Sequence, residues 1–406
     1  MAVARKWREP GSRTFSAVIA GDVCPRDENC AYVAENATRI VEGIKPFFKA
    51  EALKILQWEC AVTTGGEPIV KTGPNLRCPE NVLNFASALD IDVALLANNH
   101  TGDFGPSEIA PTMEAIRKRG ILTVGAGANA AEAARPLFIE KNGVRLAILN
   151  ICENEFGCAR KNTAGTNGMD ELANIRQIKE AKEQADVVLV TLHGGHEYDP
   201  YPSLRMVDTF RAFAEAGADA VWNCHTHCPQ GFEVWNGVPI VYSPGNFYFP
   251  PRPTSLPSWS IGYLTEFFFD EKGVYGYELV PYRFSLEGIF PIEQPYLTPA
   301  DIYLQDLCKP LTDRDELQSL FDSWCTRSGV GYMGVINCVK SDPYPPDWND
   351  PAEKAKWISV RNLFTCESHR YLLRQLGYLI EEGRVDEAAA GFDRIEKMQK
   401  PDFIKW

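Results

Sequence analysis

The sequence predicts an α/β fold followed by a helical C-terminal part, and two observations support this prediction. Between about residues 13 and 280, short apolar runs of strand length alternate with amphipathic segments of helical spacing. Alternation of this kind is typical of α/β domains built on parallel strands. After about residue 290, prolines become frequent and the apolar spacing is helical, without a strand signal. We therefore expect an α/β domain over residues 1–289, and a proline-containing linker with a helical extension over residues 290–406.

Eight apolar runs in the first part have the length and composition of buried strands. In chain order they are FSAVIA (15–20), ALKILQW (52–58), DVALLA (92–97), GILTVGAG (120–127), VRLAILNI (144–151), DVVLVTL (186–192), DAVWN (219–223) and PIVYS (239–243). Amphipathic segments lie between them, such as PSEIAPTMEAIRKRG, whose final glycine suits the end of a helix. Two further runs, YLTEFFFDEKG and VYGYELVPYRF, alternate around an Asp-Glu-Lys-Gly turn, which predicts an antiparallel hairpin closing a second sheet.

The composition argues against several classes of partner. The net charge of −13, from 41 basic and 54 acidic residues, opposes binding to nucleic acid or to an anionic membrane surface. The twelve cysteines form no CxxC pair and several follow strand-like runs, which is typical of reduced, mostly buried thiols. The N-terminal stretch has no apolar segment of signal-peptide type, and no run approaches the roughly 18 apolar residues that span a bilayer. We therefore expect a cytoplasmic protein without a membrane anchor.

Residues of metal-ligand type follow the predicted strands. They are Asp22, Glu59, Asn99, His100, His193, His225 and His227, and five of the six histidines of the chain fall at such strand ends. Functional groups of parallel α/β sheets gather outside the carboxyl ends of the strands, so residues far apart in sequence converge there. His225 and His227 are two positions apart, and in a strand they would project from the same face. A shared metal site accounts for this pattern better than a pair of surface loop histidines.

The mixture of ligand types indicates which metals would bind. Neutral imidazoles combined with carboxylates and an amide oxygen suit a divalent transition metal such as Mn, Zn or Fe. One carboxylate can bridge two ions about 3.5–4 Å apart, so the set accommodates one ion or two. The sequence contains no thiolate-rich set, which argues against a structural zinc site.

Six short motifs stand in order along the chain. They are AGDVC, WECAVT, LLANNHTGDFG, LHGGHEY, HTHCPQGFE and VYSPGNFYF, within roughly residues 14–285. In this order they resemble the bacterial capsule-synthesis CapA (poly-γ-glutamate synthesis) family, which is similar to the calcineurin-like metallophosphoesterases. The resemblance implies a four-layer α/β/β/α sandwich of the metallophosphatase type, with a two-metal-type site between the sheet edges.

The resemblance also assigns a role to each residue at a strand end. It implies a first metal bound by Asp22 and His227, a bridging Glu59, and a second metal bound by Asn99, His193 and His225. His100 would be the acid or base beside the substrate. The related phosphoesterases carry a histidine two residues after the first aspartate, whereas this chain has Cys24. Cys24 is either a thiolate ligand or an inert side chain, and the strength of the first metal site depends on which.

Five further residues are candidates that each have an ordinary structural alternative. Asp103 either orients the nearby catalytic histidine or caps a turn, and His196 and Glu197 either face the substrate or belong to a solvated loop. Asn246 either forms hydrogen bonds near the metals or supports its turn. Lys71 either meets an anionic substrate or is solvated. We assign Asp103 and His196 to the catalytic group, and Lys71, Glu197 and Asn246 to substrate binding.

Three functions fit these observations. The one we favour is a metallohydrolase that cleaves a phosphoester or a γ-glutamyl-type amide in a small-molecule or peptide-like anionic substrate. It would use a metal-activated hydroxide, with His100 as acid or base. The second is a metal-assisted peptide epimerase, as some CapA-like proteins are. The third is a non-catalytic accessory protein of poly-γ-glutamate or capsule synthesis.

Overall fold

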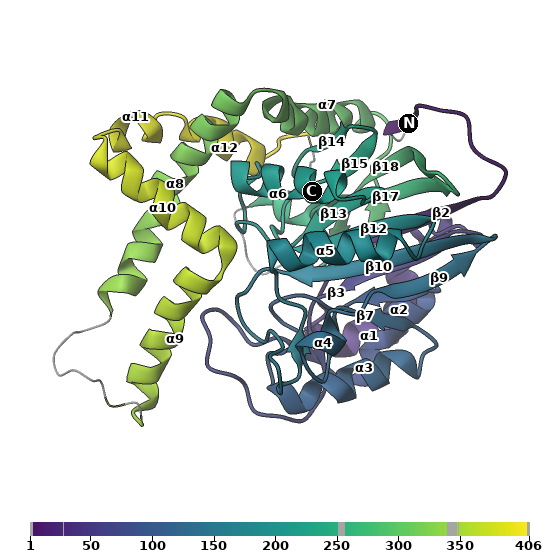
Figure 1. Ribbon diagram of the computed structural model, residues 1–406, viewed down its shortest axis with the longest axis horizontal. Coiled ribbons are helices and arrows are strands. Elements are labelled where there is room, and N and C mark those ends of the chain that lie inside the picture. Colours follow the sequence, from purple (N-terminus) through teal and green to yellow (C-terminus); the bar gives the residue numbers. More distant parts are fainter. Residues whose placement is uncertain (1–2, 27, 251–255, 339–346, 348, 404–406) are drawn as a thin grey trace.

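Two β-sheets form the centre of the molecule in the computed structural model, which describes residues 3–26, 28–250, 256–338, 347 and 349–403 (Figure 1). The larger sheet has the strand order β1-β18-β17-β2-β3-β6-β7, with β16 paired to β2 and β19 paired to β18. Its strands are β1 (Val3–Lys6), β2 (Thr14–Val23), β3 (Leu53–Trp58), β6 (Val93–Leu95), β7 (Leu122–Val124), β16 (Asn246–Tyr248), β17 (Ile261–Asp270), β18 (Gly273–Ser285) and β19 (Gly288–Pro291).

The smaller sheet has the order β14-β15-β13-β12-β10-β9. Its strands are β9 (Leu137–Lys141), β10 (Val144–Cys152), β12 (Val187–His193), β13 (Ala220–Cys224), β14 (Phe232–Trp235) and β15 (Val238–Val241). Two short pairs complete the strands: β4 (Ala61–Val62) with β5 (Arg77–Cys78), and β8 (Ala126–Gly127) with β11 (Gly165–Thr166). In both large sheets the central strands are parallel, as the alternating pattern predicted.

The two sheets share a core, and helices cover their outer faces. In β2, Phe15, Ala17 and Ile19 belong to the core between the sheets, whereas Val18 and Ala20 pack against the first helices. This division follows from the two-residue period of a strand. The covering helices are α1 (Asn29–Val41), α2 (Asn84–Ala88) and α3 (Ile109–Arg117) on the larger sheet, and α5 (Glu171–Lys182) and α6 (Leu204–Glu215) on the smaller. The order of layers is therefore α/β/β/α, as the family resemblance implied (Figure 1).

The predicted hairpin forms, but it does not close the second sheet. β17 and β18 pair antiparallel with each other, and β17 also pairs antiparallel with β2 in the larger sheet. The hairpin therefore extends the sheet that carries the first predicted strand. Local alternation predicts a hairpin, whereas the sheet that it joins depends on its pairing with a strand about 250 residues earlier.

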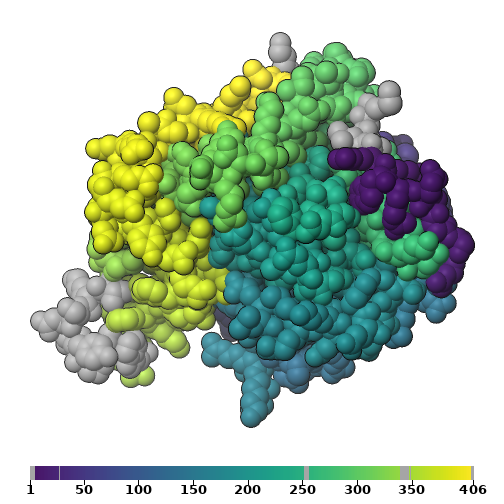
Figure 2. All heavy atoms as spheres, turned by 45° about the horizontal axis from the view of Figure 1, so that its top comes forward, coloured from purple at the N-terminus to yellow at the C-terminus, as the bar shows by residue number. Residues whose placement is uncertain are grey.

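The C-terminal part is helical, as predicted. Its helices are α7 (Leu297–Cys308), α8 (Arg314–Asn337), α9 (Pro351–Thr365), α10 (Glu367–Glu381), α11 (Val385–Ala389) and α12 (Phe392–Gln399), and we call residues 297–399 the C-terminal extension. Residues 339–346 and 348 of the predicted proline-containing linker lie outside the described residues. The extension lies against the side of the sandwich, where its green and yellow atoms meet the teal atoms (Figure 2). Leu317, Leu372 and Leu376 join the same apolar cluster as Phe210 of α6, so the extension packs on the sandwich.

Among the described residues, no helix combines the length and the apolar character that a bilayer-spanning segment needs.

Candidate metal centre

The candidate site lies where carboxyl ends of parallel strands from both sheets meet. Six buried side chains of metal-ligand type converge there: Asp22 on β2, Glu59 after β3, Asn99 after β6, His193 at the end of β12, and His225 and His227 after β13. The structure therefore brings together all six residues that the sequence assigned to metal binding. Their sequence positions span more than 200 residues, so only the strand-end rule connects them.

The paired histidines lie close together, but for a different reason from the one that the sequence suggested. β13 ends at Cys224, so His225 and His227 lie in the following loop and not on a strand. Both have positive φ, 103° and 55°, which non-glycine residues rarely adopt. The turn of this loop, and not the pleat of a strand, brings their ring centroids to 6.0 Å from each other. Backbone strain of this kind is concentrated at functional sites.

A bulge in β2 places Asp22 at the junction of the sheets. The pairing of β2 with β3 shifts between Ala20 and Asp22. At Gly21, a Cβ would lie 2.1 Å from the carbonyl oxygen of Gly245, so only glycine permits this approach of β2 to the segment before β16. The backbone N–H of His225 donates to Asp22 Oδ2 over 3.0 Å, which links β2 to the histidine loop.

The first group of ligand atoms consists of Asp22, Glu59 and His227, which lie within 4.8 Å of one another. His227 Nε2 is 3.8 Å from Glu59 Oε1. Its Nδ1 lies 2.8 Å from Oδ1 of Asn246, whose amide nitrogen donates to the Trp259 carbonyl. Asn246 Oδ1 is thus an acceptor, so Nδ1 carries the proton and Nε2 is free to bind a metal. Asn246 is fully buried and orients His227, which differs from the substrate contact that we predicted.

The second group shares Glu59 with the first. Glu59, His193 and His225 form it, and their ligand atoms also lie within 4.8 Å of one another. A third set of such atoms, from Asp22, His193 and Cys224, shares one residue with each of these two groups. His193 Nε2 is 3.3 Å from Glu59 Oε1, 3.0 Å from His225 Nδ1 and 3.1 Å from Asn99 Oδ1. A carboxylate common to two groups of ligands is what a bridging position requires.

The chemistry of these donors fits a bound cation. Both oxygens of Glu59 and Oδ1 of Asp22 are buried without a hydrogen-bond partner among the described residues. Burial, and then the charge of Asp22, raise the pKa of Glu59 well above its usual value. Burial and the neighbouring imidazoles lower the pKa of His193 well below 6.5, so its ring is neutral and offers a lone pair. Buried carboxylates without partners are costly in a folded protein, and a divalent cation would remove that cost.

A second constellation, beside the metal groups, consists of His100, Asp103 and Lys71. His100 Nδ1 lies 2.7 Å from Asp103 Oδ2, and Lys71 Nζ lies 2.6 Å from Asp103 Oδ1. Asp103 also accepts from the backbone N–H of Leu76 at 2.7 Å, so it is firmly held and orients His100, as predicted. The Lys71 side chain is only 2% exposed, so a solvated lysine is excluded, and its Nζ donates to Asp103 and also to the Asn99 carbonyl oxygen at 3.1 Å. Burial and Lys71 lower the pKa of His100, which leaves its ring neutral at neutral pH.

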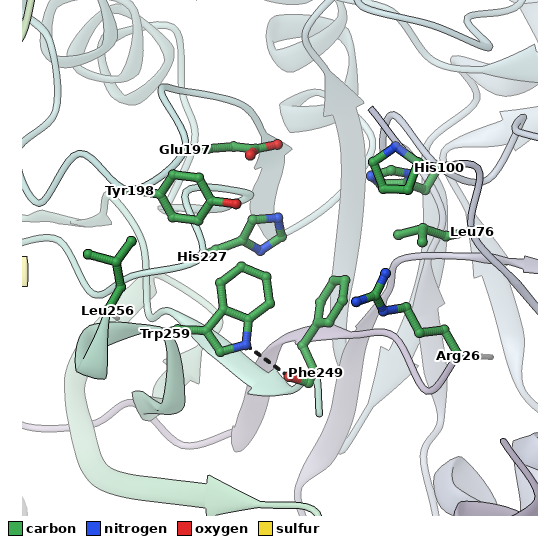
Figure 3. A pocket seen from close by; sticks show the side chains of 10 residues that line it. Arg26, Leu76, His100, Glu197, Tyr198, His227, Phe249, Leu256 and Trp259 are labelled. Atoms are coloured by element: carbon green, nitrogen blue, oxygen red, sulfur yellow. Dashed lines mark hydrogen bonds between the residues drawn. The ribbon is translucent and has the colours of Figure 1, made fainter. Parts of the chain in front are cut away.

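A pocket of about 260 Å³ opens beside both constellations. His100, Leu76 and Arg26 line one wall, and Glu197, Tyr198 and His227 line the facing wall (Figure 3). Phe249 and Trp259 form an aromatic base, with ring centroids 5.0 Å apart. The volume lies near the lower end of the roughly 300–1,000 Å³ usual for small-molecule sites, so it suits one substrate group.

His196 lies outside this pocket, unlike His100. Its Nε2 lies 2.9 Å from the carbonyl oxygen of Ser368, and its ring packs on Phe321 of the C-terminal extension. Burial lowers the pKa of His196 to about 4, partly offset by Glu153. His196 therefore holds the extension against the sandwich, and we remove it from the catalytic group. The sequence could not show this contact because its partners lie more than 100 residues away.

Cys24, which replaces a histidine of the related phosphoesterases, is fully buried and belongs to none of the ligand groups among the described residues. Burial and a hydrogen bond with Cys60 raise the pKa of Cys24 well above the usual thiol value. A thiol that resists ionisation is a poor ligand, so the inert alternative fits the structure.

Several residues of this region escaped the sequence argument. Arg26 and the aromatic residues of the pocket had no ligand-like signal, because their role depends on the fold. Glu153 and Glu155 did carry a ligand-like signal, since both are carboxylates shortly after the predicted strand 144–151. Glu155 lies beside the candidate ligand His225.

We expect His196→Gln to weaken the acid sensitivity of the metal-free fold. The folded pKa of His196, about 4, lies below its usual 6.5, so its contribution to stability is complete above pH 6.5 and falls as the pH drops towards 4. The full contribution is up to about 3 kcal/mol. Glutamine does not titrate, and its amide can still donate to Ser368. Thermal unfolding in chelator between pH 7 and pH 4 should show a shallower decline in the variant, and identical declines would contradict this role.

The sequence of this chain is similar to those of several known proteins. The family described as "Bacterial capsule synthesis protein PGA_cap" matches residues 16–251. The PGA biosynthesis protein CapA of Bacillus subtilis (strain 168) is 30% identical over 289 residues, 68% of this chain and 75% of that protein. The capsule biosynthesis protein CapA of Bacillus anthracis is 33% identical over 181 residues, 43% of this chain and 44% of that protein.

Two further similarities are more distant. A probable polyglutamine synthesis accessory protein of Mycobacterium tuberculosis is 26% identical over 207 residues, 47% of this chain and 54% of that protein. A solved 5'-nucleotidase precursor from Thermus thermophilus superposes with a TM-score of 0.39 at 13% identity, covering 69% of this chain and 54% of that chain.

The four layers, with buried carboxylates and imidazoles between the strand ends, define an α/β/β/α sandwich that carries a candidate metal centre. The family match covers more than half of the chain, and the similarity to the Bacillus subtilis protein extends over three quarters of that relative. The chain belongs to the bacterial capsule synthesis protein (PGA_cap) family.

Proposed function

We propose that the protein is a metal-dependent hydrolase that cleaves a phosphoester or a γ-glutamyl-type amide bond in a small or peptide-like anionic substrate. The observation that carries this proposal is the position of His100. Its Nδ1 faces Asp103, so its Nε2 is the free nitrogen, and the ring lines a pocket shared with the candidate metal ligand His227. An oriented acid–base group beside a metal site is the arrangement that hydrolysis by water needs.

A divalent Mn, Zn or Fe ion held by Glu59 and its neighbours would polarise the scissile bond and lower the pKa of a water molecule. The residues of the chain have separate tasks. The neutral His100 ring accepts a proton at Nε2 from the attacking water, and the Asp103 carboxylate stabilises the imidazolium that results. The same proton then passes from Nε2 to the leaving group. Arg26 offers positive charge to an anionic substrate in a chain of net charge −13.

A test of this proposal compares the metal-stripped and metal-loaded protein. We expect hydrolysis of an activated aryl phosphate or of a γ-glutamyl anilide after loading with Mn²⁺, Zn²⁺ or Fe²⁺, and its loss in excess chelator. Equal rates before and after stripping would contradict metal dependence. No hydrolysis of either class by any loaded form would contradict the hydrolase.

One observation favours the peptide epimerase as a second candidate. His100 and Glu197 line the pocket from facing walls, which is the placement that two groups need to exchange an α-proton from opposite sides (Figure 3). An accessory role, as in the name of the mycobacterial relative, is the third candidate, and turnover separates it from the other two.

A further inference from the structure

We propose that the C-terminal extension supports the metal centre. It does so by holding Glu155, a positioning residue for His225. This inference rests on the proposed metal site. The extension begins at Leu297 and so lies outside the 16–251 segment that the family match covers, whereas Glu155 lies within that segment.

The first step is the contact between Glu155 and His225. Glu155 Oε1 lies 3.4 Å from His225 Nε2, and the Glu155 side chain is 12% exposed. The other nitrogen of His225, Nδ1, is the one that faces His193. A carboxylate at Nε2 keeps the proton on that nitrogen and leaves Nδ1 free for a metal, as partners of metal-binding histidines commonly do.

The second step is that the extension holds the segment that carries Glu155. Arg361 of α9 donates from Nη2 to the Glu155 carbonyl oxygen, and its guanidinium lies over the ring of Phe156 at 5.4 Å. Lys71 lies over the same ring at 5.5 Å, so Phe156 is placed between the extension and the His100 constellation. Asn154 donates its backbone N–H to Glu367 of α10 at 2.9 Å.

The third step is the anchor at Glu153. Its carboxylate accepts from Arg205, from the Ser368 hydroxyl at 2.8 Å and from the Ser368 backbone N–H at 3.2 Å, at the start of α10. Its own backbone N–H donates to the carbonyl oxygen of His193 at 3.0 Å. The two carboxylates therefore have different roles. Glu153 binds the extension beside the candidate ligand His193, and Glu155 lies beside the candidate ligand His225.

The consequence is that variants in the extension should change metal affinity without touching a ligand. The tests use the full-length protein and Mn²⁺ titration by calorimetry, with the cobalt absorption spectrum as a second readout. We expect Glu155→Ala to weaken one binding step about 10–100-fold. Glu155→Gln should restore most of that affinity, because its amide oxygen would still face Nε2 and favour a proton there. Arg361→Met should weaken the same step, since it releases the backbone of Glu155.

The control is Glu114→Ala, which removes an exposed carboxylate from α3. The metal affinity and the cobalt spectrum of Glu114→Ala should match those of the wild type. A cobalt spectrum that changes in Glu155→Ala, while the melting temperature of the metal-free protein stays constant, separates positioning from general destabilisation.

Each contrary outcome has a distinct meaning. If the wild type binds Mn²⁺ and Glu155→Ala binds it equally well, the positioning role is wrong and the proposed hydrolase is unaffected. If only Arg361→Met retains full affinity, Glu155 acts without the extension and that half of the inference falls. A wild type that binds no metal would overturn the proposed function and this inference together.

Discussion

Glu59→Gln is expected to abolish metal binding while making the metal-free protein more stable. Glu59 belongs to both groups of ligand atoms, so its replacement removes a donor from each. We expect affinity to fall by more than about 100-fold, beyond the range seen when only a partner of a ligand is lost. The opposite effect on the metal-free fold follows from burial, because both Glu59 oxygens lack a partner among the described residues and Asp22 lies close by.

The two effects give a reversal that is simple to measure. In chelator, the neutral amide avoids the burial of a second carboxylate, and we expect a gain of about 1–3 kcal/mol. With metal at 1,000 times its Kd, the wild type gains about 4.1 kcal/mol, whereas a variant that no longer binds metal gains nothing. The order of melting temperatures should therefore invert when metal is added. Glu114→Gln, an exposed replacement of the same chemistry, should follow the wild type in both conditions, and an unchanged order for Glu59→Gln would exclude a shared ligand.

His100→Ala is expected to retain its metal and lose turnover. His100 lines the pocket and belongs to neither ligand group among the described residues, so its removal leaves those donors in place. Loss of a positioned acid–base group typically costs about 10²–10⁴ in rate. His225→Ala should lose both metal and turnover. Glu114→Ala, which removes an exposed carboxylate of α3, should change neither.

The same comparison, run in heavy water, separates the three functions. Cleavage that depends on His100 supports the hydrolase. Deuterium at a substrate α-carbon, without cleavage, supports the epimerase. If wild type and His100→Ala act alike on every substrate that the wild type binds, His100 is not catalytic and the accessory role gains support.

The convergence of the candidate metal-ligand residues could be predicted from the sequence because each of them lies at the end of a buried apolar strand or follows one. Parallel strands bring such positions together wherever they stand in the chain, and this rule joined Asp22 to His227. The rule concerns strand ends alone. It therefore predicted where His225 and His227 lie, but not the loop conformation of their backbone, because positive φ values at these residues have no signature in the local sequence.

The roles of neighbouring residues were less predictable, because they depend on tertiary contacts. Lys71, Asn246 and His196 all lie near the site in sequence, yet each contacts another protein group. The same is true of Glu155, whose supporting partners come from α9 and α10 about 200 residues later. Apolar periodicity predicts that those helices exist and gives no information on the polar groups at their ends.

The central claim is that Glu59 binds metal at a site between the two sheets. The most direct test is anomalous diffraction from crystals of the full-length protein soaked in Mn²⁺. The account predicts one or two peaks within coordination distance of a Glu59 carboxylate oxygen, and two peaks would be about 3.5–4 Å apart. The absence of any peak beside Glu59, at metal concentrations that load another site of the same crystal, would contradict it.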